Sequence, residues 1–455
     1  AKNVMLSRQI KVKKEMISEN ATAQPQELDS NLFEMNKQLE AYSLNTSAPL
    51  SSPTWPTQYE LEEGSAIISY YQTGQSLYLL LWSDDLETIR KIPLPDNFTK
   101  KVQALHELLQ NPFGSDMSRF ESLSYDIYKV VFQPIENEVQ NLNKLLILTD
   151  QVTHLIPFEV LVTEKTDVSQ FKDLHYLIKK YAISYAPSIT SLNLLLKETD
   201  VNYSKAVALA PRFSGNTVEC FVLDQGDCSR SGYGDLSWSK KEAGLVTEYF
   251  DGELLSDSLM RKDKLLKKLN NSLIIHFATH GSSNDQNPEF SKLLLGNPDS
   301  TSDFDHELFA FEVFHNQLNT ELAVLGACET GKGTISAGDG LINMANSFFH
   351  SGARSVLFSR WLANDFSTYQ IMSAFYDGLN QKLSKSEALR RAKLEYLANA
   401  DELRSHPFYW SHLSLSGNHR AIYTNKSNYI YIILATLAIL LAVYASKRKA
   451  QSIVS

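Results

Sequence analysis

The fold is decided by two segments, Ser272-Leu-Ile-Ile-His-Phe-Ala-Thr-His280-Gly281 and Glu321-Leu-Ala-Val-Leu-Gly-Ala-Cys328-Glu-Thr-Gly331. Each is an apolar run of strand length that ends in a reactive residue beside small residues. Neighbouring strands of a parallel sheet end side by side, and ligands bind in the crevice just outside those ends. A histidine and a cysteine in that position can form a nucleophile–base pair, so the two segments predict a cysteine protease.

Outward from these segments, short apolar runs alternate with helices of ten or more residues. Predicted strands lie at 66–71, 77–82, 145–150, 181–187, 206–211, 273–277, 322–325, 355–359 and 412–416. Predicted helices lie at 98–110, 122–140, 340–350, 368–379 and 386–398. This alternation predicts an α/β fold, a sandwich of helices around a mostly parallel sheet.

The composition is that of an ordinary globular protein, with 455 residues, 43% hydrophobic and 21% charged. A chain of this length forms two to three units of roughly 150 residues and can bury a large core without a disulfide or a metal. The net charge is −9, and no run of Lys and Arg is interleaved with aromatic residues. Nucleic acid is therefore not expected as a partner.

The chain divides at shifts in composition. Residues 1–46 are polar with apolar positions at helical spacing, which predicts short N-terminal helices, the end of a longer repeat region. The Pro- and Ser-containing stretch 47–56 is a predicted linker. The main domain is predicted over 57–420, with an N-terminal half at 57–205 and a catalytic half at 206–420.

The C-terminal stretch has the features of a membrane anchor. Tyr429–Ala445 contains no charged residue, and a basic tail over 447–455 follows it. A transmembrane helix is predicted over 429–446, with tyrosines near its ends. The positive-inside rule then makes the chain a single-pass membrane protein with its catalytic domain on the non-cytoplasmic side. A tail anchor inserted after synthesis would have the opposite orientation, and the alternative to a span is a buried terminal helix.

The expected chemistry centres on Cys328 and His280. A thiolate is the nucleophilic form of cysteine, so the pKa of Cys328 must fall from about 8.5, and an imidazole within hydrogen-bond reach achieves this. The backbone N–H groups of Gly281 and Cys328 are predicted to form the oxyanion hole. Cys220 and Cys228 either close a small disulfide loop or remain unpaired.

Two other sites are weighed against this one. His276 and His280 are four residues apart, which suggests zinc, but the segment reads as a strand and lacks the Glu and the third ligand of the helical metal motif. The run from Gly326 to Thr334 nearly matches a phosphate-binding loop, but Gly333 replaces the Ser or Thr that holds magnesium. No metal site is predicted. A buried structural cysteine and a buried structural histidine remain the plain alternative.

An ordered series of motifs resembles the CHAT domain, a group within the caspase and separase clan of cysteine peptidases that is often fused to TPR repeats. The matching pieces run in family order, namely His276-Phe-Ala-Thr-His280-Gly281, Gly326-Ala-Cys328-Glu-Thr-Gly331-Lys-Gly, Ala337-Gly-Asp339-Gly-Leu, Ser351-Gly-Ala-Arg-Ser-Val-Leu, Ser359-Arg360-Trp361 and His406-Pro-Phe-Tyr-Trp410. Leu155-Ile-Pro-Phe-Glu-Val-Leu and Ala182-Ile-Ser-Tyr-Ala-Pro-Ser resemble the first half of that domain. The resemblance covers residues 60–420.

The resemblance implies a caspase-like α/β/α sandwich, with His280 as the base and Cys328 as the nucleophile. It implies that the strand after Ser355 offers an edge to the substrate, so that Ser359-Arg360-Trp361 pairs with an extended peptide. Asp339 either lines an acidic pocket for Lys or Arg or is a turn residue between glycines. Arg360 stands where the family more often has an aliphatic residue.

Together these features predict a cysteine endopeptidase that cleaves a protein substrate in a regulated signalling or defence role. The chemistry needs no cofactor. The expected partners are the protein substrate, the membrane, and a regulator that binds TPR-type repeats upstream of this chain. The alternative function is a catalytically inactive, caspase-like scaffold or interaction module at a membrane.

Overall fold

The structure is a computed structural model that describes residues 61–84, 86–113, 116–196, 203–213, 236–256, 262–284, 287–296, 306–326, 334–336, 340–342, 344–361 and 364–422. Several predictions lie outside these residues. They concern the helical segment 1–46, the linker 47–56, the cysteines Cys220 and Cys228, and the C-terminal stretch 429–455.

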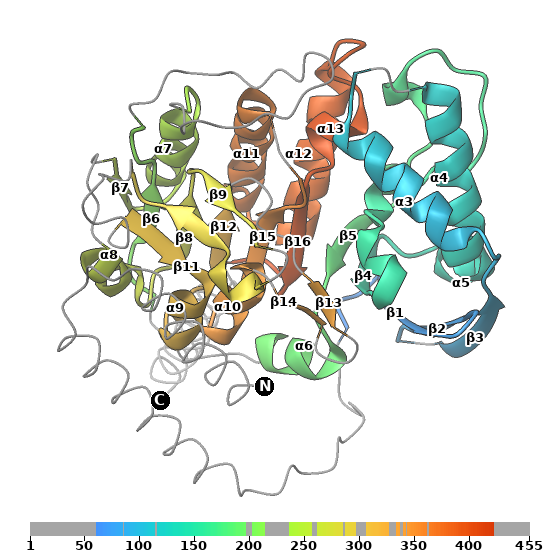
Figure 1. The fold of residues 1–455 in the computed structure, drawn as a ribbon, viewed down its shortest axis with the longest axis horizontal. Coiled ribbons are helices and arrows are strands. Elements are labelled where there is room, and N and C mark those ends of the chain that lie inside the picture. The colour runs from blue at the N-terminus through green and yellow to red at the C-terminus, as the bar shows by residue number, and fades with distance from the viewer. Residues whose placement is uncertain are drawn as a thin grey trace, which may run out of the picture.

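The centre of the molecule is an eleven-stranded sheet with the strand order β3-β2-β1-β4-β5-β16-β15-β12-β8-β6-β7 (Figure 1). The strands are β1 (Ser65–Thr73), β2 (Ser76–Trp82), β3 (Glu87–Pro93), β4 (Lys144–Leu148), β5 (Ala182–Tyr185), β6 (Ala206–Leu209), β7 (Gly252–Leu255), β8 (Ile274–Phe277), β12 (Leu322–Leu325), β15 (Ser355–Ser359) and β16 (Leu413–Gly417). The inner strands β4, β5, β6, β8 and β12 are short, and almost all of their residues are buried, as is usual for strands of a parallel sheet.

Most neighbouring strands are parallel, which confirms the predicted α/β class with a mostly parallel sheet. The pairs β1–β2, β2–β3 and β15–β16 are antiparallel. Because β16 reverses direction beside β15, the strands of the second half run opposite to β1, β4 and β5. The two groups meet where β16 lies parallel to β5, with Ser416 opposite Tyr185.

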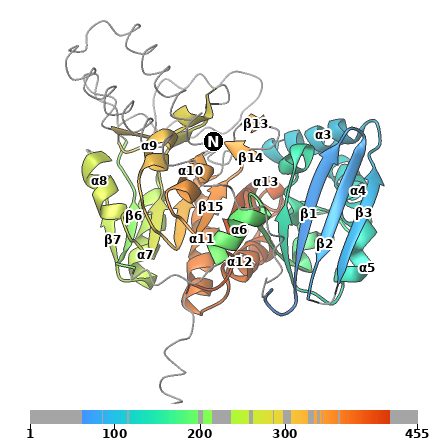
Figure 2. The ribbon, with the colours of Figure 1, turned by 90° about the horizontal axis from the view of Figure 1, so that it is seen from below.

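Helices cover both faces of the sheet (Figure 2). They are α3 (Phe98–Gln110), α4 (Met117–Val131), α5 (Glu136–Val139), α6 (Ile189–Leu196), α7 (Ser239–Tyr249), α8 (Lys262–Leu269), α9 (Ala310–His315), α10 (Met344–His350), α11 (Asp365–Asn380), α12 (Lys385–Asn399) and α13 (Pro407–Trp410). Helices α3, α4, α7, α11 and α12 pack on one face, and α6, α8, α9 and α10 pack on the other.

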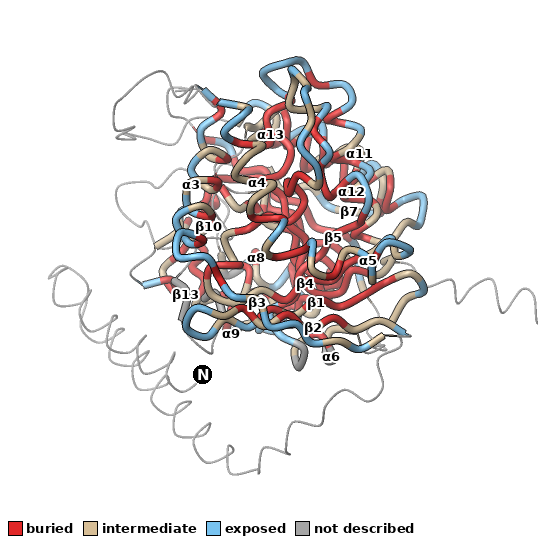
Figure 3. Tube along the Cα trace, turned by 90° about the vertical axis from the view of Figure 1, so that its right-hand side faces the viewer, coloured by how far each residue is buried: buried red, intermediate tan, exposed pale blue. Residues whose placement is uncertain are grey.

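Alternation of side chains along the strands builds these two layers. On β8, Ile274 joins the cluster under α7 and α11, whereas Ile275 and Phe277 join the cluster under α8, α9 and α10. Figure 3 shows the buried residues concentrated in the interior, and the edge strand β3 is mostly exposed.

Shorter elements complete the fold. Single-turn 3-10 helices are η1 (Gln133–Ile135), η2 (Gln151–Leu155), η3 (Phe158–Val160), η4 (Phe171–Asp173), η5 (Leu177–Lys179) and η6 (Pro288–Phe290). A small antiparallel sheet has the order β11-β10-β9, with β9 (Gly281–Ser282), β10 (Lys292–Leu294) and β11 (Glu307–Phe309). A two-stranded sheet joins β13 (Thr334–Ser336) to β14 (Gly340–Ile342).

Two predicted helices differ from the structure. The helix predicted over 122–140 is interrupted after Val131, because Pro134 lacks the N–H that a continuing helix needs. The helix predicted over 340–350 begins only at Met344, and the residues before it form β14.

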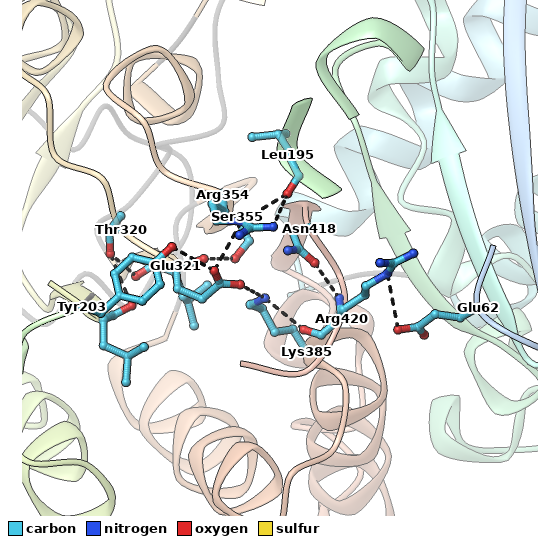
Figure 4. Close-up of polar contacts among 12 residues, drawn as sticks. Glu62, Leu195, Tyr203, Thr320, Glu321, Arg354, Ser355, Lys385, Asn418 and Arg420 are labelled. Carbon is cyan, nitrogen blue, oxygen red and sulfur yellow. Dashed lines mark hydrogen bonds and ion pairs between the residues drawn. The ribbon is translucent and has the colours of Figure 1, made fainter. Parts of the chain in front are cut away.

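A charged network joins the two halves where β12 begins (Figure 4). Glu321 accepts a hydrogen bond of 2.8 Å from Lys385 Nζ and lies 3.4 Å from Arg354 Nε. Lys385 also donates to the backbone oxygen of Arg420, whose guanidinium is 3.9 Å from Glu62 in the first half. These contacts are buried or half-buried, so they hold the ends of strands from both halves in register.

The prediction of a single-pass membrane protein is corrected by the structure. No helix among the described residues has both the length and the apolar character that crossing a bilayer requires. The longest of these helices, α11, has 16 residues and is about 24 Å long, short of the roughly 30 Å hydrocarbon core. The proposed span itself, residues 429–446, lies outside the described residues.

Candidate active site

The two segments that end in His280 and Cys328 leave the sheet side by side. Strands β8 and β12 are parallel neighbours, with Leu325 opposite Phe277 in the register. Beyond the strands, the N–H of Gly326 still donates to the Phe277 oxygen at 2.9 Å. Cys328 follows two positions later and lies outside the described residues, as does Asp339. The chain leading to Cys328 and the chain leading to His280 therefore reach the same rim of the sheet.

His280 is held in a largely buried setting at this rim. Its side chain is 9% exposed, and its ring meets the ring of Phe213 edge-on, with the centroids 4.7 Å apart. Its backbone oxygen accepts a 2.9 Å hydrogen bond from the N–H of Leu294 in β10. The neighbouring Thr279 hydroxyl donates to the Leu294 oxygen at 2.5 Å. The small sheet thus fixes the backbone on both sides of the imidazole.

The N–H of Gly281 points away from the small sheet. In an antiparallel ladder, hydrogen-bonded and non-hydrogen-bonded pairs alternate. His280 and Leu294 are a hydrogen-bonded pair, and Gly281 stands opposite Leu293 in the next position. Gly281 and Leu293 are therefore a non-hydrogen-bonded pair. The Gly281 N–H is therefore not used in the pairing of β9 with β10.

The predicted substrate-binding residues Ser359 and Trp361 have side chains that contact the protein itself. The Ser359 hydroxyl donates to the Trp361 oxygen at 2.6 Å, and the Trp361 indole N–H donates to the Phe408 oxygen at 3.1 Å. Both residues are buried at 1% exposure. Strand β15 is also paired on both edges, with β12 and with β16. An added peptide strand would have to pair beyond these residues.

Arg360 turns toward the first half of the domain. Its guanidinium stacks 4.7 Å from the Tyr185 ring centroid. Its Nη1 donates to the His154 oxygen at 3.0 Å, and its Nε donates to the Ser414 hydroxyl at 2.6 Å. Its N–H donates to the His412 oxygen, continuing the β15–β16 pairing. A half-buried arginine with these partners links the second half to the first.

Arg360 borders a buried ion pair whose two members the sequence did not connect, although Glu159 lies in the Leu155–Leu161 motif. Lys393 Nζ donates to Glu159 Oε1 at 3.2 Å, and the Tyr185 hydroxyl donates to Glu159 Oε2 at 2.6 Å. Burial opposes ionisation of Glu159, but the nearby charges of Lys393 and Arg360 outweigh it and lower the pKa of the carboxyl. Burial lowers the pKa of Lys393, and Glu159 opposes that change.

His276 lies in a second buried network on the α7–α11 side of the sheet. Its Nε2 is 3.0 Å from Glu242 Oε1 on α7, and its Nδ1 is 2.6 Å from the Tyr376 hydroxyl on α11. His276 and Tyr376 are 0% exposed, and Glu242 is 3% exposed. With both ring nitrogens occupied, His276 is a structural neighbour of the site. Sequence reasoning missed Glu242 and Tyr376, because helices from distant parts of the chain supply them.

Comparison with known proteins gives a family match over most of the described domain. A family model described as the CHAT domain matches residues 121–418, more than half of the chain. Tetratricopeptide repeat protein 28 of Homo sapiens is 26% identical over an alignment of 333 residues that covers 64% of this chain and 13% of the human protein. The protein of the same name in Mus musculus is 23% identical over 429 residues, 86% of this chain and 16% of the mouse protein. The chain thus spans only a small part of these relatives.

Solved structures that match this chain include the separase–securin complex of Saccharomyces cerevisiae. The match has a TM-score of 0.49 at 12% identity and covers 78% of this chain and 30% of the matched chain in the complex. The Arg-specific cysteine proteinase gingipain R has a TM-score of 0.39 at 12% identity, covering 71% of this chain and 74% of that chain.

Proposed function

Because the chain belongs to the CHAT domain family, as its motifs predicted, we propose that it is a cysteine endopeptidase with Cys328 as nucleophile and His280 as base. One observation carries the proposal. The hydrogen bond from Gly326 to Phe277 joins the segments of both residues at the carboxyl ends of neighbouring parallel strands. That rim is where α/β sheets bind their ligands.

The reaction would proceed by acyl transfer. His280 takes the thiol proton while the Cys328 sulfur attacks the peptide carbonyl carbon. The oxyanion accepts hydrogen bonds from the N–H groups of Gly281 and Cys328. The carbon–nitrogen bond then breaks, and His280 gives its proton to the leaving amine. Water, activated by the same imidazole, hydrolyses the thioester and restores the thiol.

Substrate recognition is proposed along the same rim. An extended peptide would lie across the ends of β8, β12 and β15, near Ser359, Arg360 and Trp361, with Asp339 contributing negative charge beside the scissile bond. An acidic pocket favours Lys or Arg in the residue before the cut. Because the side chains of Arg360 and Trp361 have internal contacts and β15 is paired on both edges, the peptide would have to pair beyond these residues.

The organisation of the chain supports a regulated enzyme. We take 57–205 as the N-terminal half and 206–420 as the catalytic half of one CHAT domain. The curated relatives carry the words tetratricopeptide repeat in their names, which supports repeats upstream that bind a regulator. In that arrangement, the repeats would present a protein signal to the catalytic domain in a signalling or defence response.

Cleavage by the intact and variant chains tests this proposal. New peptide termini are identified by mass spectrometry in a proteome incubated with the wild-type chain, with Cys328→Ala and with His280→Ala. We expect termini that require both residues, with Lys or Arg enriched before the cut. Cys328→Ser, which differs from the wild type in a single atom, is the matched control for folding. Termini that persist in Cys328→Ala would end the proposal.

A second candidate is a non-catalytic interaction module, favoured by the internally engaged side chains of Ser359 and Trp361. Labelling with a thiol-reactive peptide probe separates the two functions. An enzyme reacts at Cys328 much faster than at Cys220 or Cys228, because an activated thiolate is the reacting species. Equal, slow labelling of all three cysteines, unchanged in His280→Ala, would favour the module.

A further inference from the structure

A buried network of three side chains lies directly against the backbone that leads to Cys328. Strand β8 presents alternate residues to its two faces, and His276 faces the side covered by α7 and α11. There it contacts Glu242 Oε1 at 3.0 Å and the Tyr376 hydroxyl at 2.6 Å. These three side chains therefore connect one strand with two helices.

The hydrogen bonds of this network are complementary. An ionised carboxylate only accepts hydrogen bonds, so the imidazole hydrogen belongs on Nε2 and is donated to Glu242. Nδ1 of His276 is then left as an acceptor for the Tyr376 hydroxyl. Among the described residues, His276 is the one side chain that hydrogen-bonds Glu242. Each member thus depends on the others for its orientation.

Gly326 rests on this network. A Cβ atom at position 326 would lie 3.0 Å from Glu242 Oε1, 3.0 Å from the Phe277 oxygen and 3.6 Å from His276 Nε2. The two 3.0 Å contacts are tighter than almost all Cβ contacts, so a side chain here would crowd the Glu242 carboxylate and the Phe277 oxygen, and glycine avoids this crowding. Gly326 is two residues before Cys328, and the network thus forms the floor beneath the start of that segment.

The two helices of the network are also joined at their N-terminal ends. The N–H of Trp238, just before α7, donates to Asp365 Oδ2 at the start of α11 at 2.7 Å. The rings of Trp238 and Phe366 lie 4.6 Å apart at the same place. Helices α7 and α11 are therefore connected at their N-terminal ends, and each of them supplies one contact to His276, from Glu242 and from Tyr376.

We infer that Glu242, His276 and Tyr376 are positioning residues that hold the Gly326 backbone, and through it Cys328, in the reactive arrangement with His280. The inference rests on the proposed function. None of the three touches the substrate in this scheme, since all are buried. They act by fixing the end of β12 against β8. A small displacement of a nucleophile lowers its reaction rate strongly. Loss of these contacts should therefore slow the reaction of the Cys328 thiol in variants that still fold.

The test measures how fast Cys328 reacts with a thiol-reactive peptide probe between about pH 5 and 9, with Cys220 and Cys228 as internal references. Tyr376→Phe removes one hydroxyl, and Glu242→Ala removes the carboxylate. Glu242→Gln keeps an oxygen that accepts from His276. Tyr70→Phe is the matched control, because the buried Tyr70 hydroxyl donates to the Val131 oxygen at 2.6 Å in the first half.

We expect Tyr376→Phe and Glu242→Ala to slow labelling of Cys328 by about tenfold or more, and Glu242→Gln to remain within about threefold of wild type. Tyr70→Phe should lower the unfolding temperature as Tyr376→Phe does but leave the Cys328 rate unchanged. Labelling of Cys220 and Cys228 should be the same in all variants. If Glu242→Ala does not fold, Tyr376→Phe carries the test with the same expectation.

The outcomes distinguish failure of the positioning role from failure of the proposed cysteine endopeptidase activity. Fast labelling of Cys328 in wild type that persists in folded Tyr376→Phe overturns the positioning role alone. Equal slowing by Tyr70→Phe also overturns it, because general loosening would then explain the effect. A wild-type Cys328 that reacts no faster than Cys220 and Cys228 overturns both the proposed function and the positioning role.

Discussion

The ammonium of Lys393 lies 3.2 Å from the carboxylate of Glu159, although 234 positions separate the two residues in the chain. Lys393 comes from α12, and Glu159 comes from η3 in the first half of the domain. Their side chains are 1% and 2% exposed. Charges taken out of water are held only when each compensates the other, so this contact ties the halves together where they share the sheet.

Removing one partner of this pair should destabilise the protein strongly. We expect Lys393→Met to lower the free energy of unfolding by about 3–5 kcal/mol, because Glu159 is left as a buried charge without its cation. Adding Glu159→Gln to Lys393→Met should recover part of the loss. Urea unfolding of the two single variants and the double variant measures the coupling. Additive losses would show that the two charges do not interact.

The charged network at the start of β12 offers a comparison between a buried and an exposed lysine. Lys385 is fully buried and donates to Glu321 Oε1 at 2.8 Å, whereas Lys268 pairs with Glu253 with both side chains about half exposed. Lys385→Met should cost about 3–5 kcal/mol, since Glu321 then keeps only Arg354 as a cation and the Tyr203 hydroxyl as a donor. Lys268→Met should change stability by about 1 kcal/mol or less. Thermal unfolding in low and high salt checks both, and similar losses would contradict the burial argument.

Comparing alanine substitutions at two glycines with positive φ distinguishes the cost of backbone strain from the cost of a steric clash. Gly74 has φ +54° with nothing within 4 Å of a Cβ, whereas Gly417 has φ +93° and a Cβ there would lie 2.5 Å from the Arg354 oxygen. Gly74→Ala should cost about 1–2 kcal/mol from conformation alone. Gly417→Ala should cost about 2–5 kcal/mol, because a clash with the backbone oxygen of Arg354, just before β15, adds to the same conformational strain. Equal costs, measured by denaturant unfolding, would show that the Arg354 backbone moves aside.

Stability should fall as the pH drops below neutral, because four histidines, three of them buried and His154 half-buried, resist protonation. Burial lowers the pKa of His154, His406 and His419 to about 4, and burial with Lys393 nearby lowers that of His412 to about 3. The unfolded chain binds protons near pH 6.5 and the folded chain does not, so stability rises with pH between about 4 and 6.5. Each histidine contributes up to about 1.4 kcal/mol per pH unit in that window.

Replacement of a single histidine measures its contribution to the pH dependence of the unfolding free energy. His412→Gln should reduce the slope of unfolding free energy against pH by the equivalent of one proton, as followed by calorimetry from pH 7 to 4.5. His315→Gln is the control, since the His315 ring is exposed in the folded chain and in the unfolded chain alike. A slope that is the same in His412→Gln and wild type would show that this histidine does not control the pH dependence.

Much of the sheet was predictable from local pattern. Apolar runs of strand length and their flanking helices located β8, β12, β15 and the helix α3 closely, because hydrophobic periodicity is a property of neighbouring residues. The edge strand β3 was not predicted, since its sequence Glu-Thr-Ile-Arg-Lys-Ile-Pro is mostly exposed and carries little apolar signal. The reversal of β16 beside β15 was also not visible, because strand direction depends on pairing between distant segments.

The candidate site shows the same division. Contiguous motifs were enough to predict the family, the class of fold and the two segments that end in His280 and Cys328, because such motifs depend on local backbone geometry. The contacts of Glu242 and Tyr376 with His276, and of Arg360 with Tyr185, follow only from how the distant segments pack. The physical reason is that buried polar groups must be satisfied by whichever partners the packing of helices on the sheet supplies, and those partners lie far apart along the chain.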